Sequence, residues 1–492
     1  MRGEGSLSRR AAVTAIAAAL TAALIFPAPA APASLAPPPP PSGLTTTPIL
    51  SVRRVPGWVA ETVAAQRLAP SLSGLLAQPS LGGAARTSCL AVSQGGRSLY
   101  AANPAEALIP ASNMKLLTAT AVLDRLGTTH RIVTRVLAAH PAHGVVAGNL
   151  YLVGAGDPLL RTPAYEAALG PDETVYTSLP QLAQQVRAAG VTQITGSVVG
   201  DESRYDQLRT VPTWKPVYAA EGDVGPLSAL DVNDGTAPAA PTPPPSGASA
   251  SGLQAAASSN PAVRAATTFT GLLRGDGVHV VGAATHGTAP AGASVLTTIA
   301  SVPLATEVDN MLTVSDDTAA ELFTKELGYQ ASGSGTTAAG AAAIRADLAA
   351  DGLPLSGLVI HDGSGLDRGD RVTCNLLLAD LEHMGSTGPL ARGLPIAGQT
   401  GTLRSRMVGT PAAGRVLAKT GTLDDVVALS GFVRPGSGVT IPGAVLGQPL
   451  VFTLVLDGVP TLGAGRAVAD QIGVALATYP QLPKPAEIEP RR

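Results

Sequence analysis

The apolar residues follow different patterns along the chain, and each pattern predicts a different element. Two short runs at 86–93 and 98–102 flank a Gly-Gly pair, which predicts a β-hairpin. Residues 112–126 are apolar almost without interruption and are followed by Gly127, which predicts a helix buried nearly all round. Such a helix implies a larger core packed around it.

Beyond this helix the chain first alternates between strand-like runs and Gly/Pro turns, and then becomes rich in helices. Apolar runs predict strands at 131–138, 148–153, 197–200, 426–433 and 449–456. Apolar periodicity predicts helices within 304–327, 337–351 and 464–477. The predicted order is therefore strands, a buried helix, a segment of short strands and Gly/Pro turns, helices, strands and a closing helix.

The N-terminus has the pattern of an export signal. Three arginines within the first ten residues precede an apolar run at 11–26, which is short for a membrane span, and small residues follow at 28–33. We therefore expect a cleaved signal peptide at 1–33 and a protein that works outside the cytoplasm. If the segment is not cleaved, it tethers the chain to the membrane.

Composition marks the other boundaries. A Pro-rich stretch predicts an extended linker at 34–52, and 483–492 is a C-terminal tail. Ala, Pro, Ser and Gly dominate 235–261, which predicts a disordered loop. The remaining chain is predicted to form a discontinuous domain and an insertion, with bounds 53–135 and 300–482 for the domain and 136–299 for the insertion.

The charge composition narrows the chemistry. The formal net charge is −2 and charged residues make up 14% of the chain, so we expect no nucleic-acid partner. Lys and Arg together number 33, but almost all are arginine. The few lysines are therefore candidates for roles that require loss of a proton, which arginine does not release.

The cysteines and histidines give no sign of a metal site or cofactor. Cys89 and Cys374 are too few for a structural zinc site. Export permits a disulfide between them, but we favour two buried thiols. His140 and His143 lie in a Pro/Gly turn without a nearby carboxylate, so we interpret them as part of a solvated loop.

The buried helix begins with a Ser-x-x-Lys sequence, Ser112 to Lys115, preceded by Pro110. Residues at i and i+3 share one face of a helix, so the lysine can take the serine proton if it is neutral. The serine N–H lies at the positive end of the helix, where it can stabilise an oxyanion. A capping serine followed by a surface lysine is the alternative, but the apolar surroundings disfavour it.

A second lysine stands in a sequence suited to a strand edge. Lys419-Thr420-Gly421-Thr422 precedes the predicted strand at 426–433. A cation, hydroxyls and free backbone groups on an edge can hold the carboxylate end of a peptide laid alongside as an added strand. An ordinary turn with a solvated lysine is an equally good interpretation of this sequence taken alone.

A third polar sequence, Ser315-Asp316-Asp317, opens a predicted helix between the other two. Taken alone it is a common N-cap signature. Its position between the two lysine sequences favours a functional role.

Together these three sequences resemble the Ser-x-x-Lys, Ser-x-Asn and Lys-Thr-Gly set of penicillin-binding proteins and serine β-lactamases. The chain most closely resembles the low-molecular-mass class C D-Ala-D-Ala carboxypeptidase/endopeptidase family. Further segments carry the resemblance, which spans roughly residues 86 to 480: 110–118, 154–158, 225–230, 362–366 and 401–403. It implies an α/β fold, with an antiparallel sheet flanked by helices and split by a large inserted domain.

The resemblance also implies roles for individual residues. Ser112 would be the acylated nucleophile and Lys115 its base, and Ser315 would help to pass a proton to the leaving D-alanine. Lys419, Thr420, Gly421 and Thr422 would bind the substrate carboxylate. The N–H groups of Ser112 and Thr422 would form the oxyanion hole. The implied ligands are a peptidoglycan stem peptide ending in D-Ala-D-Ala and β-lactams, at the cell wall or in the periplasm.

The sequence departs from the family pattern at Asp317, where the family has asparagine. An ionised aspartate offers no donor, and a carboxylate near Lys115 opposes base action. We expect it to be ionised and paired with Lys115 or Lys419. A near copy of the lysine sequence, Gln399-Thr400-Gly401-Thr402, lacks the lysine, so we take Lys419 as the lysine of the motif, because the predicted strand follows it.

Other functions remain open at this point. A DD-endopeptidase or a β-lactamase could use the same residues, although no motif for an efficient deacylating base stands out. A wall-binding protein weakened in catalysis is favoured only by Asp317. A Ser-His-Asp hydrolase could use His361, Asp362 and Ser364, but these lie too close together for the usual triads.

Overall fold

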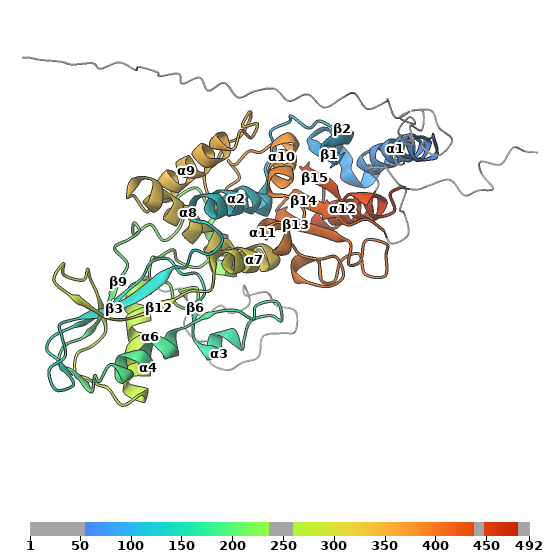
Figure 1. Cartoon of the computed structure of the whole chain (residues 1–492). Coiled ribbons are helices and arrows are strands. Elements are labelled where there is room, and N and C mark those ends of the chain that lie inside the picture. Colours follow the sequence, from blue (N-terminus) through green and yellow to red (C-terminus); the bar gives the residue numbers. More distant parts are fainter. Residues whose placement is uncertain (1–54, 236–258, 437–446, 481–492) are drawn as a thin grey trace, which may run out of the picture. The chain divides into compact units, whose positions relative to one another are not determined.

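The computed structural model describes residues 55–235, 259–436 and 447–480 (Figure 1). The signal peptide, linker and tail that we predict at 1–33, 34–52 and 483–492 lie outside these ranges. Among the described helices, none is both long and apolar enough to cross a membrane.

A five-stranded antiparallel sheet joins the N-terminal hairpin to the C-terminal strands, in the order β13-β14-β15-β1-β2. Its strands are β1 Ser88–Gln94, β2 Arg97–Ala102, β13 Val416–Leu423, β14 Val426–Val433 and β15 Leu450–Asp457. Strand β1 lies beside β15, with Ser88 opposite Leu456. The predicted hairpin and the two predicted C-terminal strands are therefore confirmed.

Helices cover both faces of this sheet, because successive side chains of each strand point to opposite sides. Leu90 and Val92 belong to one buried cluster, while Cys89 and Ala91 belong to another. The first face packs against α1 (Val55–Leu76) and α12 (Leu462–Ala477). The second belongs to a buried cluster shared with α2 Met114–Leu126, α7 Leu304–Val314, α8 Asp317–Ser332, α9 Thr337–Ala350, α10 Cys374–Met384 and α11 Pro389–Arg392. The predicted fold class is confirmed.

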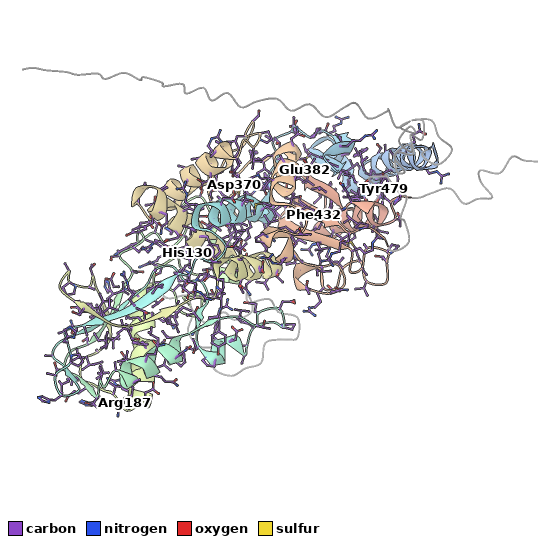
Figure 2. All side chains as sticks on the ribbon, viewed as in Figure 1. His130, Arg187, Asp370, Glu382, Phe432 and Tyr479 are labelled. Atoms are coloured by element: carbon purple, nitrogen blue, oxygen red, sulfur yellow. A yellow bond between two sulfur atoms is a disulfide. The ribbon has the colours of Figure 1, made fainter. Side chains whose placement is uncertain are left out.

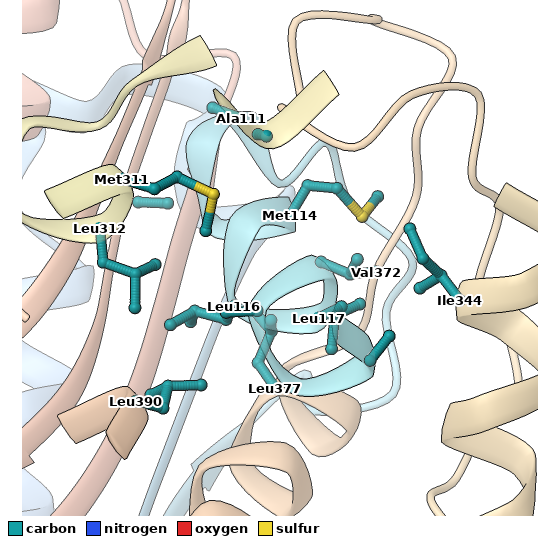
Figure 3. Packing of buried hydrophobic residues seen from close by; sticks show 14 of the residues in the cluster. Ala111, Met114, Leu116, Leu117, Met311, Leu312, Ile344, Val372, Leu377 and Leu390 are labelled. Atoms are coloured by element: carbon teal, nitrogen blue, oxygen red, sulfur yellow. The ribbon is translucent and has the colours of Figure 1, made fainter. Parts of the chain in front are cut away.

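Helix α2 is buried on all sides from Met114 to Leu123, as predicted (Figure 3). Met114, Leu116 and Leu117 are fully buried at its start. The side chains drawn around them come from four other helices and a loop: Met311, Leu312, Ile344, Val372, Leu377 and Leu390. A short 3-10 turn, η2 (Ala111–Asn113), leads into the helix and fixes where it begins.

The segment that we predict as the insertion carries a second, mixed sheet in the order β11-β9-β5-β3-β12. Its strands are β3 Val133–Ala138, β5 Leu150–Val153, β9 Val198–Asp201, β11 Thr285–His286 and β12 Ser294–Ala300. Helices α4 (Leu179–Ala188) and α6 (Pro261–Gly275) share a separate buried cluster with this sheet. Our predictions included the first three of these strands but neither helix.

The predicted loop at 235–261 needs a correction at its C-terminal end. Residues 236–258 lie outside the described ranges. Pro261, however, is the first residue of α6, and the Asn260 side chain accepts a hydrogen bond from the Val263 N–H at 2.9 Å. Asparagine at the N-cap and proline at the first position together start a helix, so the loop ends sooner than predicted.

The two cysteines are bonded to each other, so our interpretation of them as thiols is wrong. Both are fully buried, as expected, and they join β1 to α10 across a Cα–Cα distance of 6.0 Å. That distance lies within the range of protein disulfides. Phe432 of β14, labelled in Figure 2, belongs to the same buried cluster as this bridge. The sequence could not bring together two residues separated by 285 positions.

Candidate active site

Ser112 and Lys115 lie where the buried helix begins. Ser112 is in the η2 turn, and Lys115 lies in the first turn of α2, on the same helix face. Lys115 is fully buried, because the helix around it packs on all sides. An ammonium group that cannot reach water must find partners inside the protein.

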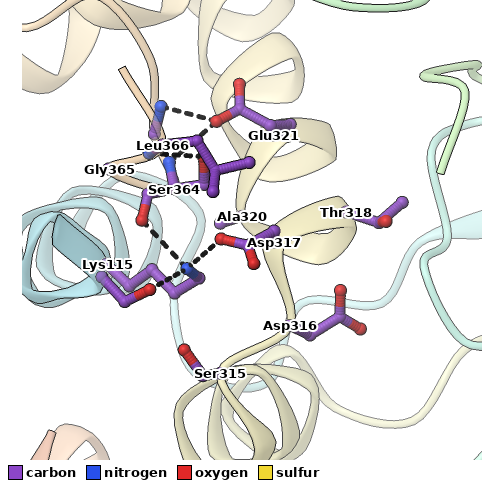
Figure 4. Close-up of polar contacts among 12 residues, drawn as sticks. Lys115, Ser315, Asp316, Asp317, Thr318, Ala320, Glu321, Ser364, Gly365 and Leu366 are labelled. Carbon is purple, nitrogen blue, oxygen red and sulfur yellow. Dashed lines mark hydrogen bonds and ion pairs between the residues drawn. The ribbon is translucent and has the colours of Figure 1, made fainter. Parts of the chain in front are cut away.

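The Lys115 Nζ has three such partners (Figure 4). It lies 3.0 Å from the Ser112 Oγ, 2.5 Å from the Asp317 Oδ1 and 2.9 Å from the Ser364 carbonyl oxygen. The lysine is thus held between a candidate nucleophile, a carboxylate and a backbone acceptor. The structure brings Ser112, Lys115 and Asp317 together, as the sequence predicted.

Asp317 is a member of an ion pair in a largely dry place. Its side chain is 14% exposed and pairs with the fully buried Lys115. Burial raises the pKa of Asp317 above its usual value, although the positive charges of Lys115 and Lys419 oppose the shift. The expectation that Asp317 pairs with one of the two lysines is confirmed for Lys115.

Ser315 stands at a corner between two helices. It ends α7 in the left-handed conformation, with φ of 66°, and α8 begins two residues later. Asp316 caps α8, since its side chain accepts a hydrogen bond from the Ala319 N–H at 2.9 Å. A left-handed residue other than glycine is costly, so the surrounding packing must hold this corner in place. The cap and the corner together present Ser315 and Asp317 to the two lysines.

Lys419 approaches the same place from the sheet. It lies on β13, is fully buried, and its Nζ donates to the Ser315 Oγ at 2.7 Å and to the Thr420 carbonyl oxygen at 2.9 Å. No carboxylate lies within ion-pair distance of Lys419 in the described part of the chain. Burial, together with the positive charge of Lys115, lowers the pKa of Lys419 well below its usual value. An anion placed beside it would reverse that effect.

Strand β13 is an edge strand, so the Lys419 sequence forms a strand edge and not a turn. The Ala418 N–H donates outward to Pro395, and the Val416 carbonyl accepts from Ala397, so even-numbered backbone groups of β13 face away from β14. By the same alternation the backbone groups of Thr420 and Thr422 face the open edge. They offer main-chain partners for one more extended chain.

Gly421 allows this strand to lie directly against the nucleophile turn. A Cβ at this position would lie 2.9 Å from the Pro110 carbonyl oxygen and 3.2 Å from the Ala111 Cβ. Any larger residue would therefore push β13 away from Ser112. The Lys-Thr-Gly sequence is thus constrained by packing as well as by chemistry.

A buried loop at 362–366 supports Lys115 from the other side. The Glu321 Oε1 accepts hydrogen bonds from the Gly363 and Ser364 N–H groups at 2.9 and 2.8 Å. These bonds fix the loop, and the Ser364 carbonyl oxygen of this loop accepts a hydrogen bond from the Lys115 Nζ. Sequence reasoning did not find Glu321, because nothing near it in the chain suggests a partner 43 residues away.

The alternative Ser-His-Asp site is wrong. Ser364 is fully buried, and its hydroxyl accepts from the Leu366 N–H within the loop. Asp362 is also fully buried and accepts from the Trp214 indole N–H at 2.7 Å, while His361 is exposed. These residues serve the structure of the loop rather than a triad.

The near copy of the lysine sequence also lies at the site, although Lys419 supplies the lysine of the motif. The Thr420 Oγ1 donates to the Thr402 Oγ1 at 2.8 Å. We did not predict this contact, because the segment lacks a lysine at position 399. Only the folded arrangement brings the two Gly-Thr segments side by side.

The predicted insertion also reaches the site. Trp214 contacts the loop at Asp362, as described above. Burial raises the pKa of Asp223 to about 6, and the negative charge of Asp317 adds to this rise. Asp223 also feels the positive charge of Lys115, so it lies near the ion pair.

A second charged cluster, which we call the Arg161 cluster, lies on the other side of Asp316. Arg161 is fully buried, and carboxylates of the described residues lie 3.2 to 4.0 Å from its guanidinium: Glu166, Glu173, Asp234 and Asp316. Burial raises the pKa of Glu173 to about 7 and that of Asp316 to about 6. The cluster ties the predicted insertion to the residue that caps α8.

Known proteins share this sequence and fold. A family model described as D-Ala-D-Ala carboxypeptidase 3 (S13) matches residues 68–255 and 247–479. A D-alanyl-D-alanine carboxypeptidase of Actinomadura sp. (strain R39) is 31% identical over 481 residues, covering 84% of this chain and 85% of the relative. A carboxypeptidase of Mycobacterium tuberculosis is 31% identical over 393 residues, covering 77% and 79%.

A solved structure has a similar arrangement of elements. The crystal structure of penicillin binding protein 4 from Haemophilus influenzae matches with a TM-score of 0.64 and 20% identity. The match covers 79% of this chain and 95% of that protein. At this identity the similarity concerns the fold.

Proposed function

The chain belongs to the D-Ala-D-Ala carboxypeptidase 3 (S13) family, and we propose that it is a serine-type D-Ala-D-Ala carboxypeptidase acting through an acyl-enzyme on Ser112. The observation that carries this proposal is the buried Lys115 Nζ at 3.0 Å from the Ser112 Oγ. Its substrate would be a peptidoglycan stem peptide ending in D-Ala-D-Ala, and β-lactams would acylate the same serine.

Acylation begins with a proton transfer. A neutral Lys115 takes the Ser112 hydroxyl proton while the Oγ attacks the carbonyl carbon of the penultimate D-alanine. The N–H groups of Ser112 and Thr422 would hold the resulting oxyanion. The open edge of β13 supports this arrangement, because it directs the Thr422 backbone toward an incoming chain.

Breaking the peptide bond requires a proton for the leaving amine. Ser315 receives a hydrogen bond from Lys419, so the two can form a relay from the lysine to the D-alanine nitrogen. The terminal carboxylate of the substrate would lie near Lys419, Thr420 and Thr422. It would supply the anion that this buried lysine lacks, in agreement with its lowered pKa in the free protein.

Water completes the cycle by attacking the acyl-enzyme and releasing the shortened peptide from Ser112. If the chain bound at this edge were instead cross-linked to a neighbouring stem peptide, the enzyme would cleave that cross-link and act as a DD-endopeptidase. We keep this activity as the second candidate. A β-lactamase would hydrolyse its penicilloyl-enzyme rapidly. The N-terminal pattern supports export, so we propose that the enzyme acts outside the cytoplasm, at the cell wall or in the periplasm.

The test is labelling with a fluorescent penicillin, followed by mapping of the modified residue. We expect modification of Ser112, loss of labelling in Ser112→Ala, and release of D-alanine from a synthetic stem peptide. His361→Ala serves as the matched control, because it removes the histidine of the rejected triad and should label normally. Full labelling of a folded Ser112→Ala protein would refute the assignment, and cleavage of cross-linked dimers without D-alanine release would favour the endopeptidase.

A further inference from the structure

Three side chains from three segments meet near the C-terminal end of α2, away from the nucleophile at its other end. Asp124 lies in the last turn of α2, Asp351 directly follows α9, and His383 lies in the last turn of α10. One oxygen or nitrogen of each lies within 4.8 Å of the other two. The proposed reaction uses none of them.

The distances are unsuited to hydrogen bonds but suited to a metal. The His383 Nε2 lies 3.6 Å from the Asp124 Oδ2 and 3.9 Å from the Asp351 Oδ2. A hydrogen bond would require about 2.7–3.2 Å. Ligand atoms placed about 2.1 Å from a tetrahedral zinc ion lie roughly 3.4 Å from one another. A contraction of a few tenths of an ångström would therefore complete three corners of a zinc polyhedron.

Carboxylates outnumber cations at this place. The Asp351 Oδ2 faces His383 but makes no hydrogen bond. Asp380 is fully buried one turn before His383 on α10, beside the Thr120 hydroxyl, and no ion pair joins it to a cation in the described residues. Asp124, Asp351 and His383 all act electrostatically on Asp380. Three carboxylates therefore gather around His383, and this end of α2 can accept a further positive charge.

The neighbouring arginine does not neutralise these carboxylates. Arg125, the next residue on α2, pairs with Asp347 of α9. Access from solvent is open, since the side chains of Asp124, Asp351 and His383 are 38%, 23% and 36% exposed. An ion could enter without unfolding the helices.

We propose that Asp124, Asp351 and His383 bind one Zn²⁺ ion, with water at the remaining position. Imidazole nitrogen and carboxylate oxygen are both donors that bind this ion. Bound zinc would join the ends of α2, α9 and α10, and so stabilise the helix that carries Ser112 and Lys115. Because the site is remote from Ser112, its occupancy would affect stability rather than the reaction itself.

The experiment is calorimetric titration of the exported chain, freed of metal, with Zn²⁺. We expect one equivalent to bind, and the melting temperature to rise with zinc concentration because only the folded chain presents the site. His383→Ala should weaken binding by about tenfold or more, since loss of even a supporting residue costs that much. Replacing Zn²⁺ by Co²⁺ should give the visible absorption of a tetrahedral ion.

A double variant, His140→Ala with His143→Ala, is the matched control, because it removes a different surface histidine pair that lies in the predicted insertion. It should bind zinc as the unaltered chain does. Penicillin labelling of every variant reports whether the protein is folded. The proposal fails if the unaltered chain binds no zinc, as expected for a histidine simply paired with two aspartates, or if folded His383→Ala binds it equally well.

Discussion

Two charged clusters lie on opposite sides of the Asp316–Asp317 pair, and they are unbalanced in opposite directions. On one side, Lys115 and Lys419 are both fully buried, and Asp317 pairs directly with Lys115 alone. On the other, Arg161 alone faces the four carboxylates of its cluster. The first side has an excess of buried cations and the second an excess of buried acids.

The difference indicates a division of roles between adjacent residues. A site short of negative charge is prepared for an anionic ligand, as the carboxylate end of a D-Ala-D-Ala peptide would be. A site short of positive charge retains protons, because burial and mutual repulsion raise the pKa of its carboxyl groups. Asp317 belongs to the first side, and Asp316 anchors the same turn to the second.

The largest expected effect comes from Lys115→Arg, which keeps the charge but removes the ability to act as a neutral base. We expect the rate of penicillin acylation to fall by about 10²–10⁴-fold, the usual contribution of a general base. Stopped-flow or gel-based acylation rates would measure it. Lys419→Arg is the comparison and should be milder, since that lysine binds through its charge. If Lys115→Arg were acylated at the rate of the unaltered enzyme, another group would have to be the base.

Breaking the acid-rich cluster should affect stability. Arg161→Met leaves buried carboxylates without their cation, and we expect the free energy of unfolding to fall by about 3–5 kcal/mol. Urea unfolding would measure it. Arg187→Met on α4 is the control, because Arg187 is exposed and its loss should change the stability by less than about 0.5 kcal/mol. Equal stability of the two variants would mean that the cluster contributes nothing.

The same cluster predicts a pH dependence. Burial raises the pKa of Glu173 in the folded protein to about 7, above its usual 4.5, so the folded state binds this proton more tightly than the unfolded state. Its stabilising contribution is complete below pH 4.5 and is lost as the pH rises to 7.

The loss amounts to at most about 3.5 kcal/mol, at about 1.4 kcal/mol for each pH unit. Glu173→Gln should therefore flatten the decrease in unfolding free energy between pH 4.5 and 7, as measured by urea unfolding at a series of pH values. An unchanged slope would show that Glu173 does not hold this proton.

The smallest of the four effects is expected at Asp317, where the sequence departs from the asparagine of the family. Asp317→Asn removes a carboxylate that favours the ammonium form of Lys115, so acylation at neutral pH should accelerate by about tenfold. Acylation by the unaltered enzyme should also depend more steeply on pH. Rates measured from pH 5 to 9 would test both. A slower Asp317→Asn enzyme would mean that the carboxylate takes part in catalysis.

The sequence predicted the elements that carry local patterns. The buried helix and the hairpin each have an apolar run or a turn within a few residues, and both are present. The Lys419 sequence taken alone fitted a strand edge and a turn equally well, and the structure has the strand edge. The Ser112, Lys115 and Asp317 contacts also follow from a resemblance that spans the chain.

Features made by distant pairs could not be predicted in this way. Arg161 meets Asp316 across 155 positions of sequence, and no local pattern marks either residue as a partner. The thiols of Cys89 and Cys374 were misjudged for the same reason. Thr402 was set aside because its segment lacks a lysine, yet a hydroxyl opposite Thr420 requires none.

The pairing of β1 with β15 has a consequence for how the protein is made. Strand β1 is synthesised early, but its neighbour at Leu450–Asp457 follows more than three hundred positions later. The hairpin at Ser88–Ala102 must therefore wait, with one edge unpaired, until nearly the whole chain has been synthesised. A chain that stops before Leu450 separates β14 from β1, so the sheet cannot form around Lys419. A peptidase built in this way can complete its site only when its synthesis is almost finished, so an incomplete chain has no activity.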